Sequence, residues 1–170
     1  MDQLLRRIVT GIDKNGKAVF ESDDIPGVTF TMEEEWPGFN NVELWQTKNP
    51  LPELHDIHDK DRNYDFNIPP GIIRFCTMRL PPLKKLIAHQ KSLGKDIDLQ
   101  TFGMHRTDTI DYLILLEGEA TLVLENGEEK TLKPGDTVVQ KGNVHSWHNR
   151  GNIDCIMACV MIGAKPPRNH

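Results

Sequence analysis

Several features are scarce or missing in this chain of 170 residues, and each absence excludes a class of protein. Three cysteines are present, Cys76, Cys155 and Cys159, and none has the Cys-x-x-Cys spacing of a metal knuckle. An odd number of cysteines makes no disulfide framework, so we expect buried, reduced thiols. No apolar run approaches the length of a membrane span, and the N-terminus lacks the apolar core of a signal peptide. A cytoplasmic protein with no membrane partner is therefore expected.

Positive charge and cofactor fingerprints are also lacking. The net charge is −5, and no basic stripe is visible, which argues against a nucleic-acid partner. No glycine-rich phosphate loop follows a predicted strand, and no Gly-x-Ser-x-Gly elbow occurs, so nucleotide cofactors and serine hydrolysis are excluded. With 38% hydrophobic and 26% charged residues, the composition is that of a globular protein, and the length fits one domain.

What the chain does contain is a series of short strand-like segments separated by turn residues. Residues 6–20 predict a β-hairpin around Asn15-Gly16, because Asn-Gly is a strong hairpin signal. A short amphipathic helix is expected at 83–93, and a long polar loop at 48–70. Further strands are expected at 41–47, 71–80, 105–116, 119–125, 129–132, 137–140 and 153–162. This spacing is typical of an all-β sandwich or barrel.

One of these segments, 105–116, begins with polar side chains at alternate positions. They are His105, Thr107, Thr109 and Asp111. In a strand, alternate side chains point to the same face, so an imidazole and a carboxylate are expected to share one face. A second histidine, His145, lies about one hairpin further on. Two strands that each offer a histidine, one with a carboxylate nearby, are what a small metal or acid–base site inside a barrel requires.

These segments resemble the motifs of the cupin superfamily. Its first motif has the form G-x5-H-x-H-x3-4-E-x6-G. His105 matches the first histidine and Gly118 the closing glycine. Thr107 stands where the second histidine is expected, and Asp111 replaces the glutamate. The resemblance covers residues 103–163 closely.

The second cupin motif has the form G-x5-P-x-G-x2-H-x3-N. In this chain Gly135 opens it, Gln140 stands at the proline position, and three residues match: Gly142, His145 and Asn149. The spacing between Gly135 and Gln140 is one residue short of the family pattern.

The resemblance implies a cupin jelly-roll β-barrel with extra N-terminal strands and one short helix. Residues 71–170 would form the barrel, and residues 1–70 would add strands and a long loop to the same domain. Small cupins of this kind commonly dimerise through such extensions, so a homodimer is expected. The fold does not give the function, because cupins include oxygenases, decarboxylases, isomerases, dehydratases, lyases and plain binding modules.

Carried over residue by residue, the family's metal site leaves His105, His145 and Asp111 as ligands. A set of two histidines and one carboxylate suits a divalent metal such as Fe, Zn, Mn or Ni. Two alternatives stay open. In one, a histidine acts without metal as the general base for proton abstraction next to a carbonyl. In the other, the histidines only satisfy buried hydrogen bonds.

The expected function is that of an enzyme acting on a small carbonyl- or carboxylate-bearing molecule, as a lyase, decarboxylase, dehydratase, isomerase or dioxygenase. Thr107 and Thr109 would orient a substrate oxygen. Trp147 shares parity with His145 and would line the pocket or pack in the core. Arg74, mid-strand among apolar neighbours, would bind a carboxylate or form an ion pair on an outer face. The other class is a non-catalytic ligand-binding barrel, which turnover would separate from an enzyme.

Two further segments carry hypotheses. His55 and His58 form a His-x2-His pair in a polar, acidic loop, and such a pair is expected to be solvated surface rather than a metal site. The helix at 83–93 and its tail to residue 102 come just before the first motif. We hypothesise that this segment lids the barrel mouth.

Overall fold

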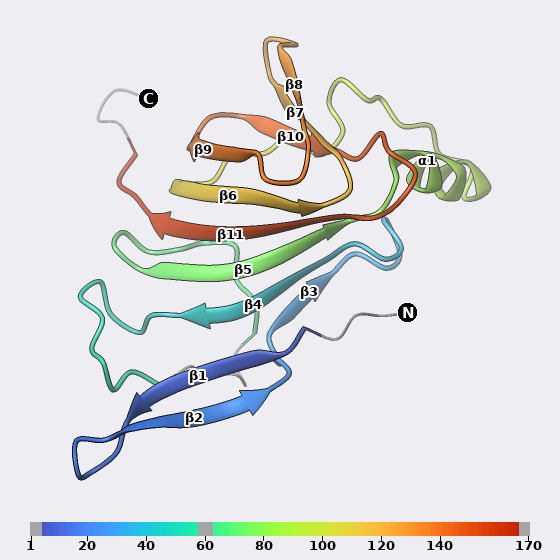
Figure 1. Cartoon of the computed structure of the whole chain (residues 1–170). Coiled ribbons are helices and arrows are strands. Elements are labelled where there is room, and N and C mark those ends of the chain that lie inside the picture. The colour runs from blue at the N-terminus through green and yellow to red at the C-terminus, as the bar shows by residue number, and fades with distance from the viewer. Residues whose placement is uncertain (1–4, 58–62, 167–170) are drawn as a thin grey trace.

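The computed structural model describes residues 5–57 and 63–166. They form two antiparallel sheets, a separate two-stranded hairpin and one helix (Figure 1). The larger sheet has the order β3 (Thr29–Thr31), β4 (Asn40–Gln46), β5 (Ile73–Leu80), β11 (Cys155–Gly163), β6 (Thr109–Glu117), β9 (Thr137–Lys141). The smaller sheet has the order β10 (His145–His148), β7 (Ala120–Leu124), β8 (Glu129–Leu132). The all-β jelly-roll expectation is confirmed.

Alternating burial explains why the central strands form. In β6, Leu113 and Leu115 are buried, whereas Tyr112 and Ile114, which alternate with them, are exposed. Alternate side chains of a strand face opposite sides of the sheet, so one side faces the core. Both sheets contribute to that core, since it also contains Trp147 from β10.

The helix α1 (Leu83–Ser92) lies at one end of the sheets (Figure 1). It begins directly after Pro82 and buries Leu83 and Leu86, the two residues three apart that face the core. Asn149, which follows β10, anchors this end of the barrel. Its amide donates to the carbonyl of Leu80 at 2.7 Å, and its backbone carbonyl accepts the Leu83 N–H at 2.6 Å.

The hairpin of β1 (Arg7–Ile12) and β2 (Ala18–Asp24) stands beside the larger sheet (Figure 1). It was expected from the Asn15-Gly16 turn, and Gly16 adopts the left-handed φ of 77° that such a turn needs. The expected helix and the strand at 71–80 are also confirmed. The short strand β3 was not expected, because its sequence lies among turn-forming residues. Among the described residues, no helix is long and apolar enough to cross a membrane.

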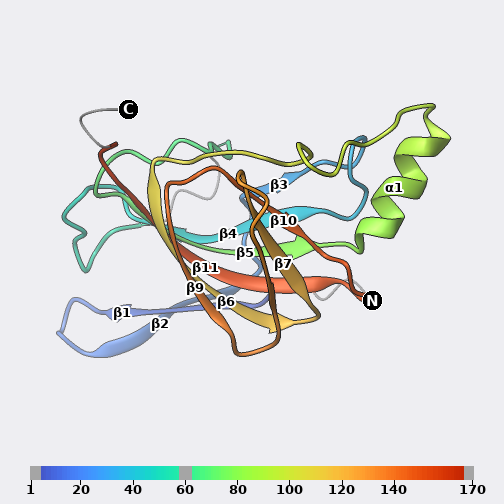
Figure 2. The same cartoon turned by 90° about the horizontal axis from the view of Figure 1, so that it is seen from above.

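The first motif departs from its expectation in one respect. The strand predicted to begin at residue 105 begins at Thr109, so the prediction of one continuous face from His105 to Asp111 was wrong. His105 is held by an isolated bridge to His145 instead, with reciprocal N–H···O distances of 2.9 and 3.0 Å. Residues 105–108 therefore lie outside β6, and His105 pairs with the start of β10 instead. Figure 2 shows the segment from α1 to β6 running along the molecule to the end where β6 begins.

Gly118, between β6 and β7, allows a close backbone contact. Its φ is 78°, and a Cβ there would lie 2.5 Å from the Asp154 carbonyl oxygen. Gly127, in the turn between β7 and β8, has a φ of 83° but would place a Cβ in open space. An alanine at Gly127 would therefore cost backbone strain alone, whereas an alanine at Gly118 would cost both strain and a steric clash.

We therefore expect Gly118→Ala to lower the free energy of unfolding far more than Gly127→Ala. The control should lose about 1–2 kcal/mol, from the left-handed backbone alone. The Gly118 variant should lose at least about 2 kcal/mol more, because backbone atoms must move. Urea unfolding monitored by circular dichroism measures both. Equal losses would contradict the clash.

Candidate functional site

Two histidines from different segments lie side by side at the edge of the barrel. The rings of His105 and His145 have centroids 4.5 Å apart and planes tilted by 48°. His145 is buried, whereas His105 is exposed. The pair therefore sits where the barrel interior meets solvent. The structure thus brings together one histidine from each motif, and their assignment to one functional site stays a prediction.

Hydrogen bonds to the backbone fix the tautomer of both rings. The Nδ1 of His105 lies 2.8 Å from the Gly103 carbonyl oxygen, and the Nδ1 of His145 lies 2.9 Å from the Asn143 carbonyl oxygen. A carbonyl oxygen only accepts, so each Nδ1 carries the proton and each Nε2 keeps its lone pair. Within residues 5–57 and 63–166, neither Nε2 has a hydrogen-bond partner. Metal-binding histidines are commonly oriented in this way.

Burial keeps His145 neutral. Desolvation lowers its pKa to about 4, with a smaller lowering from the charge of His105. A neutral imidazole is ready to bind a metal without losing a proton. The same low pKa makes His145 a weak general base at neutral pH, because proton-transfer efficiency follows basicity.

Asp111 is buried in the same barrel but is not clustered with both histidines. Desolvation raises its pKa, while the Thr109 hydroxyl and the charge of His105 lower it. Its Oδ1 is buried and has no described hydrogen-bond partner. In the part of the chain that the structure describes, no three His, Cys, Asp or Glu side chains form a group that could hold a metal ion. Two imidazoles and a carboxylate are donor types that fit a divalent metal. Among them, the structure brings only the two imidazoles close together.

Asp111 belongs to a row of side chains that crosses five strands of the larger sheet. Strand pairing places these residues opposite one another in turn: Gln46, Arg74, Met161, Asp111 and Gln140. Directly paired residues point to the same face of a sheet. Because Asp111 faces the barrel interior, the whole row does.

Arg74 is held in this row by a buried ion pair. Its Nε lies 3.0 Å from Glu43 Oε2, and both side chains are 1% or less exposed. It also donates to Gln46 Oε1 at 2.8 and 3.0 Å and to the Asp65 carbonyl at 2.6 Å. The ring of Tyr64 packs over the guanidinium, 4.7 Å from its carbon. The ion pair lies inside the barrel, which differs from the outer-face alternative. The carboxylate-binding alternative stays a prediction.

The other expected site residues are placed less centrally. Thr107 and Thr109 are linked by their hydroxyls at 2.8 Å, and Thr109 is buried whereas Thr107 is half-buried. Trp147 is part of the core, with its ring 6.2 Å from that of His145. His55 is exposed in its loop, and His58 lies outside the described residues.

The tail after α1 makes contacts along β10. The Phe102 carbonyl lies 3.4 Å from the Nε2 of His148, a buried residue of that strand. The idea that this segment lids the mouth stays a hypothesis. What the structure shows is that Phe102, its last residue, contacts β10, the edge strand that carries His145.

Sequence reasoning missed the interior roles of Gln140, Glu43 and Tyr64. Gln140 is buried opposite Asp111, and its amide donates to Asn143 Oδ1. A signal was present, since a glutamine stands where the family has proline. Glu43 gave no comparable signal, because its partner Arg74 is 31 positions away in the chain and meets it only through the pairing of β4 with β5.

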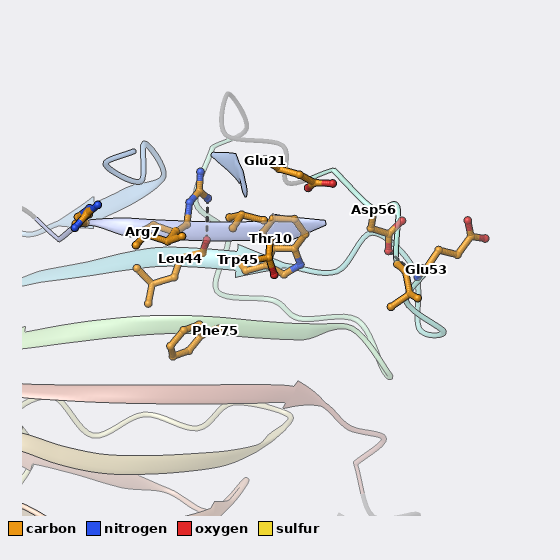
Figure 3. Close-up of a pocket in the computed structure, with 12 residues that line it drawn as sticks. Arg7, Thr10, Glu21, Leu44, Trp45, Glu53, Asp56 and Phe75 are labelled. Carbon is orange, nitrogen blue, oxygen red and sulfur yellow. Dashed lines mark hydrogen bonds between the residues drawn. The ribbon is translucent and has the colours of Figure 1, made fainter. Parts of the chain in front are cut away.

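A separate hollow lies outside the barrel, between the β1–β2 hairpin, the outer face of β4 and β5, and the loop after β4 (Figure 3). Its volume is about 550 Å³. Leu44, Trp45 and Phe75 line its apolar side. Arg7 borders it, donating to the Leu44 carbonyl at 2.8 Å and pairing with Asp24. None of the expected catalytic side chains lines this hollow.

Comparison with known proteins agrees with the motifs. A family model described as "Cupin domain" matches residues 99–161. The chain is 39% identical over 166 residues to the "Cupin-domain-containing oxidoreductase virC" of Hypocrea virens, which covers 94% of this chain and 76% of that protein. This protein belongs to the cupin family.

Other relatives share less of their length. A "Cupin-domain-containing oxidoreductase fogC" of Aspergillus ruber is 30% identical over 148 residues, covering 84% of this chain and 63% of the relative. The "Phomopsin biosynthesis cluster protein C'" of Diaporthe leptostromiformis is 48% identical over 79 residues, which span 44% of this chain and less than half, 42%, of that protein. Among solved structures, a putative ethanolamine utilization protein of Salmonella typhimurium has a TM-score of 0.49 at 13% identity, covering 96% of this chain and 99% of that one.

The burial of His145 makes a prediction about stability and pH. Its folded pKa of about 4 lies below the ordinary value of 6.5, so between these pH values only the unfolded chain takes up the proton. The free energy of unfolding of the metal-free protein should therefore fall as pH falls through this window, by up to about 1.4 kcal/mol per pH unit.

Urea unfolding at pH 7, 6 and 5 measures this effect. His145→Gln should flatten the pH dependence, leaving the smaller share of His148, whose pKa is also lowered by burial. His55→Gln, at an exposed histidine, is the control and should leave the slope unchanged. A His145→Gln slope equal to that of the unsubstituted protein would contradict the assignment.

Proposed function

We propose that the barrel is the active site of a small-molecule oxidoreductase of the cupin type, in which His105 and His145 bind a divalent first-row metal ion. The observation that carries this proposal is the orientation of the two rings. Each Nδ1 is directed to a backbone carbonyl, so the Nε2 lone pair of each ring is left for a metal, on two rings whose centroids are 4.5 Å apart. The relatives named as oxidoreductases support the reaction class.

The proposed roles follow from the environment of each side chain. His145 stays neutral through burial, and His105 is open to solvent, so a ligand reaches the pair from outside. The metal would polarise a carbonyl or carboxylate oxygen of the substrate, or activate dioxygen. Asp111, whose pKa is raised by burial, would hold or exchange a proton near His105. Asp111 as a third metal ligand remains a prediction.

The metal-free alternative uses a histidine as general base. The pKa of about 4 of His145 disfavours it for that residue, because a base works best with a pKa near the operating pH. His105 would then carry the role alone. A non-catalytic ligand-binding barrel is the remaining alternative, and it would show ligand-induced stabilisation without product.

Elemental analysis of the purified protein tests the metal proposal. We expect about one equivalent of metal after incubation with Fe(II), Mn, Ni or Zn, and a loss of at least tenfold in affinity in His105→Ala and in His145→Ala, because each removes one of few ligands. His55→Ala, outside the barrel, is the control. Absence of metal in the unsubstituted protein under all four conditions would overturn the proposal and leave the metal-free alternatives.

We also propose that the protein forms a homodimer through the outer face of the larger sheet. Strand pairing aligns Phe75, Val160, Tyr112 and Val139 in one row across that face, and three of them are exposed. A continuous exposed apolar patch marks an interaction site, and the same patch on a second copy is complementary by two-fold symmetry. The hollow of Figure 3 continues the patch through Phe75 toward the hairpin.

Light scattering coupled to size-exclusion chromatography tests the dimer. The double variant Tyr112→Lys/Val139→Lys should be monomeric, because like charges would face each other across the two-fold axis. Lys133→Glu, an exposed residue of the turn between β8 and β9, is the control and should stay dimeric. A monomeric unsubstituted protein, or a double variant that stays dimeric, would contradict the proposed surface.

A further inference from the structure

The polar row across the larger sheet lies beside a row that is apolar on four strands and carries Glu43 on β4. One step further along the strands, the inward positions of β5, β11, β6 and β9 are Cys76, Cys159, Leu113 and Val138. The row that contains Arg74 and Asp111 instead carries a guanidinium, a carboxyl and two amides. Polar groups inside a barrel cost free energy unless something hydrogen-bonds them, so their unused atoms indicate what the site binds.

Arg74 offers one unused donor group with a defined direction. Its Nε and Nη2 form the edge that bonds Gln46 and Glu43, both on β4. Nη1 lies on the other side of the guanidinium from that edge and so points away from β4. It is buried and has no partner in the described part of the chain. In the sheet, β11 and β6 lie on the side of β5 that is opposite to β4.

Asp111 offers the second unused atom, on the far side of Met161. Its Oδ1 is buried and also has no described partner. One strand, β11, separates Arg74 from Asp111, which corresponds to roughly 10 Å between their Cα atoms at the usual strand spacing. No ion pair joins the two residues in the described structure. Met161, which pairs with both, is half-buried and packs against the edge of the core.

We propose that this row binds a two-ended substrate. A carboxylate or carbonyl oxygen accepts from Arg74 Nη1, an apolar ring lies over Met161, and a hydroxyl at the other end of the ring hydrogen-bonds Asp111. A carboxyl group can satisfy a hydroxyl in either protonation state, by accepting or by donating. A flexible, soft thioether suits contact with a ring. The proposal rests on the proposed function in taking the barrel as the substrate site, but it does not require a metal.

Calorimetric titration with a matched set of ligands tests the two ends separately. The probes are 4-hydroxybenzoate, which has both ends, benzoate, which lacks the hydroxyl, and phenol, which lacks the carboxylate. We expect 4-hydroxybenzoate to bind at least tenfold more tightly than either of the others. Comparing ligands on the unsubstituted protein measures the Arg74 end without disturbing its buried ion pair with Glu43.

A variant then assigns the hydroxyl end. Asp111→Ala should weaken 4-hydroxybenzoate binding at least tenfold and leave benzoate binding unchanged, because only the first ligand uses the carboxyl. Asp108→Ala removes an exposed carboxylate of the same segment and should change neither affinity. The ratio of the two affinities is insensitive to a general loss of stability, since both ligands would then be affected alike.

Several results would overturn the proposal. They are no binding of 4-hydroxybenzoate, equal binding of the three probes, or an equal loss of both acids in Asp111→Ala. Loss of bound metal in Asp111→Ala would also overturn it, by assigning Asp111 to the metal. Metal content is therefore measured on the same samples. If the protein binds no metal but prefers 4-hydroxybenzoate, the two-ended binding is supported and the metal proposal fails. If it binds metal but shows no such preference, the metal proposal is supported and the two-ended binding fails.

Discussion

The register of β11 between β5 and β6 is the constraint on which the rest of the structure depends. β11 pairs with β5 from Cys155 to Ile162 and with β6 from Ile156 to Gly163. This pairing places Cys159 opposite Cys76 on one side and Leu113 on the other, inside the barrel. A slip by one residue would turn every inward side chain outward. For β11 itself, Cys159 and Met161 would then leave the interior, and Val160 between them would enter it. The apolar positions thus decide where the polar ones go.

Compensation of charge lowers the free-energy cost of burying that polar row. Glu43 neutralises Arg74 at 3.0 Å, burial favours the protonated form of Asp111 by raising its pKa, and burial keeps His145 uncharged by lowering its pKa. Desolvation favours the neutral form of an acid and of a base alike. Inside the barrel, Arg74 and Glu43 thus cancel each other's charge, and burial disfavours the charged forms of Asp111 and His145.

Most secondary structure could be predicted because it rests on local signals. The Asn15-Gly16 turn predicted the first hairpin, and polar residues at alternate positions from His105 to Asp111 predicted a strand that overlaps β6. The same alternation placed Thr109 and Asp111 inside, as they are. It failed at His105 because residues 105–108 form no ladder with a sheet neighbour, and parity has meaning only within a strand. The strand β3 was not predicted for a related reason, since its three residues are too few to show an alternating pattern.

The sequence by itself determined the family, the strand content and the identity of the two histidines, because spacing, turn residues and motif letters are properties of the chain. Only the tertiary structure decided how the groups meet. The Gly103 and Asn143 carbonyls fix the histidine tautomers, and pairing between distant strands joins Glu43 to Arg74 and sets Gln140 opposite Asp111. Such contacts join segments far apart in the chain. Their energies depend on burial, which no local pattern encodes.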